Sequence, residues 1–389
     1  MSGPVGARDG DPPKSLPDFD LALVLSGGNA LGAFQAGAYQ QLHEAGLEPA
    51  LVSGASAGAI NGAIICGAPP DQRVSRLEAF WKPAARSAWG MTMFEEARRT
   101  AAAVGAIAGG QPDLFVPRHL WGPWWNPFGN PEPSSLYDAT ALEHRLAQLI
   151  DFDLLNDGAT PFCATAVNVE TGENVVLDTR QQRIGARHIR ASAALIPFFS
   201  PVRVDDRWLA DGGFSTNLPL DPVLAAPPVR PLLCLAVDLL PLHSGPPDGL
   251  GAAASRAQDL IFAAQSRRSI AAWQAIYDGW AAAECPPSIT LLHLSYGRQN
   301  REVSGKALDF SAESAADRWQ AGRQAMEMAV AKLRANELAI GRPGLTVCGD
   351  TAAGPLNELR WSLGPATACQ ADPHAAAPTP KSPHTPLVR

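Results

Sequence analysis

The chain has 389 residues, of which 46% are hydrophobic, and its 31 basic and 38 acidic side chains leave a net charge of −7. This size and composition suffice for one large α/β core, or for a core with an appended subdomain. The acidic balance and the lack of a dense basic run exclude nucleic acid as a partner and give no support to polybasic attraction to a membrane.

The N-terminus is polar and contains no apolar core, so we expect residues 1–18 to be a flexible leader rather than a signal peptide. No stretch reaches the ~20 apolar residues that a membrane-spanning helix needs. The six cysteines are widely spaced, and those in apolar surroundings are typical of buried thiols in a reducing compartment. We therefore expect a cytoplasmic protein and leave peripheral contact at the inner membrane open.

A glycine-rich segment follows the first apolar run. Residues 21–25 have the length and composition of a buried parallel strand, and a helical pattern starts after Gly32. A strand, a glycine loop and a helix in this order commonly form an anion-binding site, because the backbone N–H groups of the loop point toward the anion. A dinucleotide fingerprint would need glycine in place of Asn29, and a P-loop would end in Gly-Lys-Ser/Thr, so both fit poorly. In a serine acyl hydrolase, the N–H groups of Gly27, Gly28 and Asn29 would stabilise an oxyanion; the alternative is an ordinary tight turn.

A second glycine motif nominates a nucleophile. Residues 51–58 form a short apolar run that ends in G-x-S-x-G, the pattern of a nucleophile elbow with Ser56 at its tip. Gly54 and Gly58 are small enough for the sharp turn. The residues that follow are expected to form a helix, whose first amides, including that of Ala57, favour negative charge beside the serine. An ordinary turn of small residues is the alternative.

A serine nucleophile needs a base. The segment 202–210 alternates like a hairpin with an Asp-Asp turn and leads into Asp211, followed by Gly212 and Gly213, which permit close backbone approach. Histidine is the usual base, and His243 and His293 are the plausible candidates for a triad. A direct Ser-Asp dyad with Asp211 as the base suits the sequence better.

With these motifs in order, the chain resembles the patatin-like phospholipase family, over roughly residues 19–225. Two departures lie in the first block, where Asn29 replaces the third glycine and Leu31 replaces the usual Arg or Lys. The backbone N–H donors can be retained despite both changes. The changes nevertheless leave the activity level and the headgroup preference open. Four blocks carry the resemblance: Gly27–Gly32, Gly54–Gly58, the Ala-Ser-rich segment Ala191–Phe199, and Asp211–Gly213 with Asn217–Pro219.

The resemblance implies an α/β, three-layer fold with a mostly parallel central sheet flanked by helices, plus the C-terminal α/β extension of a bacterial subgroup. We expect a catalytic domain at 19–228, an extension at 229–345 that continues the α/β unit, and a disordered Pro/Ala-rich tail at 365–389. The extension is predicted to contain strands at 231–237 and 289–294 and helices near 252–282 and 312–338.

An irregular stretch between Gly110 and Ser135 is rich in proline, glycine and aromatic residues. It could be a lid or an acyl-chain wall, or a loop pinned to its own domain by its aromatic side chains. The latter is the simpler interpretation. Its large aromatic residues are Trp121, Trp124, Trp125 and Phe128.

The resemblance implies a serine acyl hydrolase of phospholipase A or lipid esterase type that acts in lipid catabolism. Ser56 would be the nucleophile, Asp211 the general base, and Gly27, Gly28, Asn29 and Ala57 the oxyanion hole, with no metal and no cofactor. The expected partner is a lipid acyl ester. Two alternatives stay open: a Ser-His-Asp α/β-hydrolase esterase, and a catalytically weak lipid-binding protein of the same family.

Overall fold

The structure is a computed structural model that describes residues 18–82, 95–118, 135–280, 285–297, 299, 301–351 and 354–361. The expected leader up to residue 17 and the predicted tail at 365–389 lie outside these ranges. The same holds for the four large aromatic residues of the irregular stretch, Trp121, Trp124, Trp125 and Phe128.

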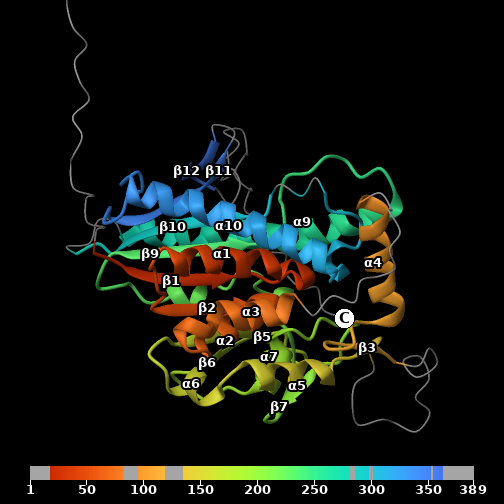
Figure 1. The fold of residues 1–389 in the computed structure, drawn as a ribbon. Coiled ribbons are helices and arrows are strands. Elements are labelled where there is room, and N and C mark those ends of the chain that lie inside the picture. The colour runs from red at the N-terminus through yellow and green to blue at the C-terminus, as the bar shows by residue number, and fades with distance from the viewer. Residues whose placement is uncertain are drawn as a thin grey trace, which may run out of the picture.

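One sheet forms the centre of the molecule (Figure 1). Within the described ranges, ten strands join it in the order β12-β11-β10-β9-β1-β2-β5-β8-β7, and β6 also pairs with β5. The strands from β11 to β5 run parallel, whereas β12, β6, β7 and β8 make antiparallel pairs. The strands are β1 Asp20–Leu25, β2 Leu51–Ala55, β5 Phe162–Asn168, β6 Asn174–Asp178, β7 Val202–Val204, β8 Arg207–Asp211, β9 Leu232–Asp238, β10 Ser288–Ser295, β11 Gly344–Thr351 and β12 Gly354–Leu359.

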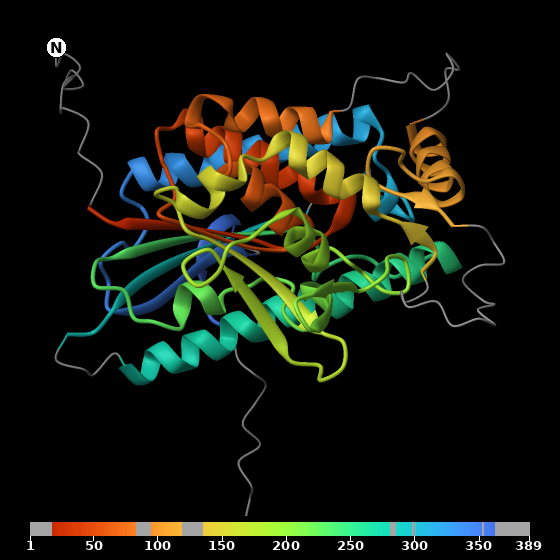
Figure 2. The ribbon, with the colours of Figure 1, turned by 90° about the horizontal axis from the view of Figure 1, so that it is seen from below.

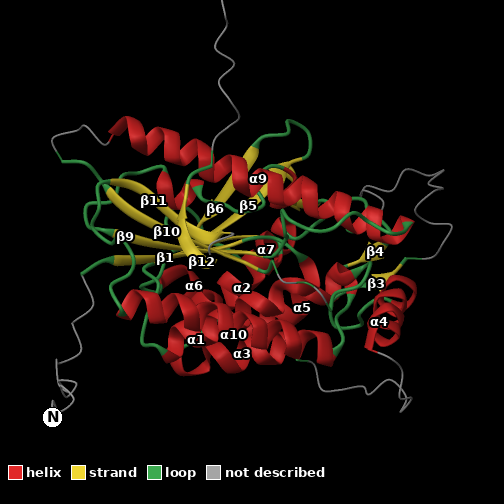
Figure 3. Ribbon diagram, turned by 90° about the horizontal axis from the view of Figure 1, so that it is seen from above, coloured by secondary structure: helices red, strands yellow, loops and turns green. Residues whose placement is uncertain are grey.

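Helices cover both faces of this sheet, which is why its parallel strands are almost continuously apolar. Figures 2 and 3 show the long helix α9 lying across one face, where Trp273 and Tyr277 bond it to the short α8, while α1, α2, α3, α5 and α10 gather on the other. The predicted three-layer α/β fold with a mostly parallel sheet is confirmed. The helices are α1 Ala33–Glu44, α2 Ala57–Cys66, α3 Arg73–Trp81, α4 Glu95–Gly109, α5 Thr140–Leu149, α6 Phe152–Asp157, α7 Ala186–Ser192, α8 Asp221–Leu224, α9 Leu250–Trp280 and α10 Ala312–Arg334.

Short elements complete the fold at the ends of the strands. The 3₁₀ turns are η1 Asn29–Gly32, η2 Pro70–Gln72, η3 Gly212–Phe214 and η4 Lys306–Leu308. A separate two-stranded sheet pairs β3 Val116–Pro117 with β4 Tyr137–Asp138. Turn η1 is separated from β1 by three residues, and η3 follows β8, with Gly212 packed against Thr165 of β5. Thr165 pairs with Ala55 at the end of β2, so both turns lie near the carboxyl ends of parallel strands, where a ligand-binding site is expected in an α/β protein.

Several elements predicted from local pattern are found as expected. The apolar run at 21–25 is β1, and the hairpin predicted at 202–210 is formed by β7 and β8. The first predicted helix is α1, and Gly46 beyond its end has a φ of 76°, the left-handed backbone that glycine adopts at helix ends. The helices predicted near 252–282 and 312–338 are α9 and α10.

The segment after residue 229 shares the sheet with the preceding part of the chain. Strand β9 pairs with β1 in parallel, β10 pairs with β9, and α10 lies along α1 (Figures 1 and 3). The two helices approach closely at two glycines: a Cβ on Gly37 would collide with the carbonyl of Trp319, and one on Gly322 with the carbonyl of Phe34. The division at residue 228 itself stays a prediction.

We expect Gly37→Ala to lower the free energy of unfolding by about 1–3 kcal/mol, because the added methyl group forces α1 and α10 apart. Gly105→Ala in α4 is the matched control, since a Cβ added there would meet no atom within 4 Å and alanine favours a helix by up to ~1 kcal/mol. Urea unfolding of the two variants checks this. Equal stability of the Gly37 variant and the native chain would contradict the close packing.

Candidate active site

Ser56 sits at a sharp turn between β2 and α2. Its φ of 54° and ψ of −122° are a strained conformation for a residue with a side chain, and they are typical of a nucleophile elbow. The Ser56 N–H is held by Ser192 at the end of α7, whose carbonyl and hydroxyl oxygens lie 3.1 and 3.2 Å away. Ser56 is largely buried, with 5% of its surface exposed.

The two glycines of the elbow are required by backbone contacts. A Cβ on Gly54 would collide with the carbonyl of Gly58, and a Cβ on Gly58 would collide with the carbonyl of Leu25 at the end of β1. The glycines therefore let the first turn of α2 pack directly on two neighbouring strands. This contact fixes the place of Ser56 relative to the loop that follows β1.

Asp211 ends β8 and lies beside Ser56. The residue is 3% exposed, and its carboxyl accepts a 2.7 Å hydrogen bond from the N–H of Gly213. Burial raises the pKa of Asp211 to about 6, while hydrogen bonds with the Ser56 side chain and the Gly213 N–H oppose the rise. A Cβ on Gly212 would collide with the carbonyl of Thr165 in β5, so glycine is needed there for β8 to deliver the carboxyl.

The glycine loop lies next to the elbow, but its first amide is already bonded. Gly27 donates its N–H to the carbonyl of Asn217 at 3.1 Å, so the prediction that this N–H would contribute to an oxyanion hole is wrong. The N–H groups of Gly28, Asn29 and Ala57 have no acceptor among the residues that the structure describes. These three amides therefore remain as the candidate donors.

The two departures in the glycine loop have clear structural consequences. Asn29 has a φ of 50°, the left-handed region that asparagine tolerates better than most residues, so the backbone course that glycine permits is kept. Leu31 is fully buried in the main core. Its side chain therefore packs inside the protein and does not line the cavity beside Ser56.

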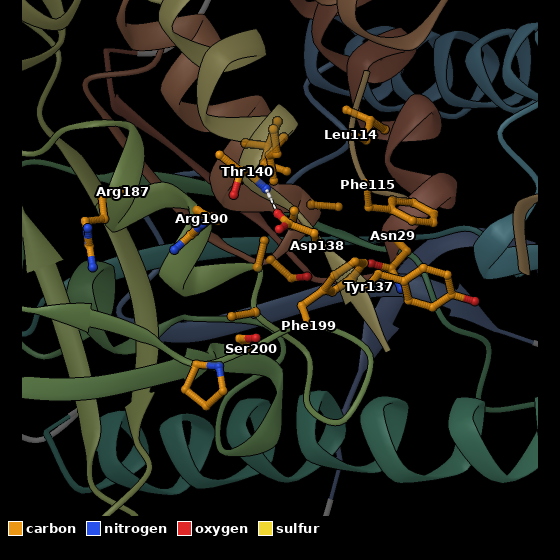
Figure 4. A pocket seen from close by; sticks show the side chains of 18 of the residues that line it. Asn29, Leu114, Phe115, Tyr137, Asp138, Thr140, Arg187, Arg190, Phe199 and Ser200 are labelled. Carbon is orange, nitrogen blue, oxygen red and sulfur yellow. Dashed lines mark hydrogen bonds between the residues drawn. The ribbon is translucent and has the colours of Figure 1, made fainter. Parts of the chain in front are cut away.

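The predicted residues meet at one cleft, which brings Gly27, Gly28 and Asn29 together with Ser56 and Asp211. A larger cavity of about 120 Å³ opens on the other side of Asn29 and Ser56. Figure 4 shows Phe115, Tyr137 and Phe199 on one side of it and Arg187 and Arg190 on the other. Its apolar wall consists of Ile60, Phe80, Trp81, Leu114, Phe115, Leu142, Phe199 and Phe310.

Most of this wall is absent from the sequence predictions. Phe115 packs edge-on against Tyr137 at a centroid distance of 5.0 Å and against Phe310 at 5.9 Å, which joins three distant segments. Such a wall has no periodicity in the sequence. A usable signal was the pair Arg187 and Arg190, which are three residues apart just before the Ala-Ser-rich block.

The two candidate triad histidines lie elsewhere. His293 is buried in β10, with its Nε2 3.2 Å from the Asp238 carboxylate and its ring edge-on to Trp361. His243 is exposed in the loop after β9. Among the described residues, no histidine lines the cleft or the cavity at Ser56.

Three further features bear on the kind of site this is. The described side chains of His, Cys, Asp and Glu form no group of three or more that could hold a metal ion. The described cysteines are free thiols. In the ranges that the structure covers, every helix is too short or too polar to cross a bilayer.

The comparisons with known proteins identify the family. A sequence model of the patatin-like phospholipase family matches residues 23–224, and a second, described as patatin phospholipase, matches residues 262–338. The chain belongs to the patatin-like phospholipase family. The family match supports a lipid hydrolase. No curated protein matches the sequence.

Two solved structures are similar to this chain. VipD from Legionella pneumophila has a TM-score of 0.41 and 17% identity, with 81% of this chain and 67% of that chain covered. The type III effector protein ExoU has a TM-score of 0.34 and 16% identity, with 82% of this chain and 54% of that chain covered. The chain thus spans about two thirds of the first protein and about half of the second, and the family assignment rests on the sequence matches.

Proposed function

We propose that this protein is a serine acyl hydrolase of phospholipase A or lipid esterase type. Ser56 attacks the acyl carbonyl while the Asp211 carboxylate accepts the hydroxyl proton. The observation that carries the proposal is the buried carboxyl of Asp211, which lines one cleft together with a serine held in the strained backbone of a nucleophile elbow. Neither candidate histidine lies at this serine.

In the first half-reaction, the Ser56 oxygen forms a bond to the acyl carbon and the carbonyl electrons move onto oxygen. The N–H groups of Gly28, Asn29 and Ala57 stabilise this oxyanion. The tetrahedral intermediate collapses, and the alcohol leaves with the proton held by Asp211. In the second half-reaction, water gives a proton to Asp211 and its oxygen bonds to the acyl carbon. The bond from the Ser56 oxygen to that carbon then breaks, Asp211 returns the proton to the serine oxygen, and the fatty acid leaves. We also propose that this reaction needs neither a metal nor a cofactor, as expected from the sequence.

The pKa of Asp211 supports this role, since a general base works best when its pKa lies near the working pH. A value of about 6 leaves the carboxyl ionised at neutral pH, yet far more basic than an exposed aspartate. The rival Ser-His-Asp esterase needs an essential histidine. The other rival, a lipid-binding protein without turnover, needs an unreactive serine.

A fluorophosphonate probe tests the nucleophile. We expect the probe to label Ser56 in the native chain and to leave Ser56→Ala unlabelled, and we expect this variant to lose hydrolysis of p-nitrophenyl butyrate while its thermal unfolding is preserved. Full activity of Ser56→Ala would refute the assignment. A native chain that resists the probe and does not hydrolyse the ester would favour the lipid-binding alternative.

The pH dependence of hydrolysis is a further prediction. We expect kcat/KM for p-nitrophenyl butyrate to rise with pH through an apparent pKa of about 6 and then level off, because only the ionised Asp211 accepts the serine proton. Rates measured from pH 5 to 8 at constant ionic strength check this. A profile that is flat in this range, or whose inflection disappears in His293→Ala, would argue against Asp211 as the base.

The proposal extends to where the protein meets its substrate. A cytoplasmic protein that reaches lipid by peripheral contact with the inner membrane fits the free thiols of the described cysteines. Co-sedimentation with vesicles of bacterial lipid, compared with neutral detergent micelles, tests this contact.

A further inference from the structure

Two hollows meet at Ser56, and they differ in the reacting groups that line them. Ser56 and Asn29 line both the cavity of about 120 Å³ and the smaller cleft of about 20 Å³. Asp211 lines the cleft and does not line the cavity. The carboxyl that handles the proton is therefore on one side of the serine, and the apolar wall is on the other.

This division assigns the two ends of an ester to different sides of Ser56. In the proposed reaction, Asp211 takes the serine proton and then gives it to the oxygen of the leaving alcohol. That oxygen must lie within hydrogen-bond reach of the Asp211 carboxyl, because a proton is transferred only over such a distance. The alcohol therefore occupies the cleft, and the acyl chain lies along the apolar wall of the cavity.

Helix α9 supplies one wall of the cleft. Gln258 and Phe262 line it, and the Oε1 of Gln265 accepts a 3.2 Å hydrogen bond from the N–H of Asn217, another lining residue. These three positions of α9 are four and then three residues apart, so their side chains form one stripe on the helix. A Cβ added to Gly213 would lie 3.3 Å from the Phe262 ring, which places this stripe against the loop after β8.

The side-chain amide of Gln258 is available to a ligand in the cleft. Gln258 is half-buried, and its amide makes no hydrogen bond with another residue that the structure describes. The amide of Asn217 already donates to the glycine loop, at 3.4 Å, and Leu240 and Phe262 are apolar. Among the described lining residues, Asp211 is the single charged side chain. The cleft thus offers an uncharged donor and acceptor, which suit a hydroxyl group.

We propose that Gln258 is a specificity-determining residue that hydrogen-bonds a free hydroxyl on the leaving alcohol. The site then favours an ester whose alcohol carries a second hydroxyl a few bonds from the ester oxygen, as in a polyol, over an ester of a plain alkyl alcohol. The inference rests on the proposed function and adds a residue outside the part of the chain, residues 23–224, that matches the patatin-like phospholipase model. Selection of the alcohol is thereby assigned to α9 and separated from selection of the acyl chain.

The test compares 2-hydroxyethyl butyrate with propyl butyrate, which share the acyl group and differ by a hydroxyl in place of a methyl group. We expect the native chain to favour the hydroxyethyl ester in kcat/KM, and Gln258→Met to lower the ratio of the two values by about three- to ten-fold, as the loss of one neutral hydrogen bond predicts. Gln320→Met is the matched control, because Gln320 is exposed on α10 and lines neither hollow. An unchanged ratio in Gln258→Met, or an equal fall in Gln320→Met, overturns the proposal.

A second ratio tests the division between the two hollows. The kcat/KM for p-nitrophenyl octanoate relative to p-nitrophenyl butyrate reports on the acyl chain alone, since the alcohol is the same. We expect Gln258→Met to leave this ratio within about two-fold of the native value, because the acyl chain lies away from α9. A change in the acyl ratio as large as the change in the alcohol ratio overturns the assignment of the cleft to the alcohol.

Transfer of the acyl group to an added alcohol separates this inference from the proposed function. With p-nitrophenyl butyrate and equal concentrations of ethylene glycol and 1-propanol, the alcohol oxygen bonds to the acyl carbon, the Ser56 oxygen leaves, and the alcohol proton passes through Asp211 to the serine. Gln258→Met should lower the ratio of hydroxyethyl to propyl ester formed. If the native chain hydrolyses p-nitrophenyl butyrate but both proteins form the two esters in the same ratio, this inference alone is overturned. If the native chain hydrolyses none of these esters, the proposed function and this inference are overturned together.

Discussion

Replacing Asp211 with asparagine is expected to lower kcat for p-nitrophenyl butyrate at least about a hundred-fold, since general-base catalysis typically contributes roughly 10²–10⁴-fold. The same change is expected to stabilise the fold at neutral pH. Burial raises the pKa of Asp211 from 3.8 to about 6, so the ionised carboxylate is unfavourable in the folded state by roughly 3 kcal/mol. The amide has no charge to desolvate, and its oxygen can still accept from Gly213.

The sign of the pH dependence makes this prediction specific. As pH rises from about 4 to about 6, the native chain loses the free energy of unfolding that the protonated Asp211 retains at lower pH. The asparagine variant has no group that titrates at this position, so it keeps its stability there. The stability difference should therefore be present above pH 6 and absent below pH 4, in urea unfolding followed by circular dichroism. Asp206→Asn in the exposed hairpin turn is the control and should show neither effect. An asparagine variant at position 211 with more than a tenth of native activity would contradict the dyad.

Replacing Arg318 with methionine is expected to lower the free energy of unfolding by about 3–5 kcal/mol, because it leaves the buried charge of Glu302 with the more distant Arg99, at 3.6 Å, as its remaining ion partner among the described residues. Arg318 is fully buried and binds both oxygens of Glu302, at 2.8 and 2.7 Å. It also donates to the carbonyl of Ala30 in the glycine loop at 3.1 Å. Ester hydrolysis should therefore fall as well, since the loop loses a fixed contact.

Arg323→Met on the same helix is the matched control. Its partner Glu44 is near the surface, and such a pair contributes about 1 kcal/mol or less. The double variant Arg318→Met with Glu302→Gln should recover part of the lost stability, because it removes the buried carboxylate that has lost its closest ion partner. Urea unfolding of the four proteins checks this. Equal losses in the two single arginine variants would show that the buried pair has no special role.

The catalytic blocks could be predicted from sequence because their requirements are local. The contacts that demand glycine at positions 54 and 58 are made within β1, the elbow and α2, which are close in the chain. The strained backbone of Ser56 follows from the same short segment. The alternation of residues 202–210 likewise predicted the hairpin that carries Asp211.

The errors and omissions arise where distant segments meet. The N–H of Gly27 is bonded to Asn217, which lies 190 residues further along the chain, and no local pattern foretells that bond. Similarly, Leu31 in place of the usual Arg or Lys suggested that the glycine loop had lost a cation. In the structure, Arg318 of α10 donates to the carbonyl of Ala30, the neighbour of Leu31. The small strands β6 and β12 and most of the cavity wall depend on tertiary packing in the same way.

The place of Phe310 in the cavity wall has a consequence for comparing relatives. Phe310 comes from the segment after β10, whereas the serine, the aspartate and the glycine loop all lie within the first 225 residues. The proposed reacting groups and part of the cavity wall beside them can thus diverge independently during evolution. Two relatives with identical catalytic blocks need not share a substrate. The lipid preference of one can be inferred from the other only where their sequences also agree across the C-terminal third.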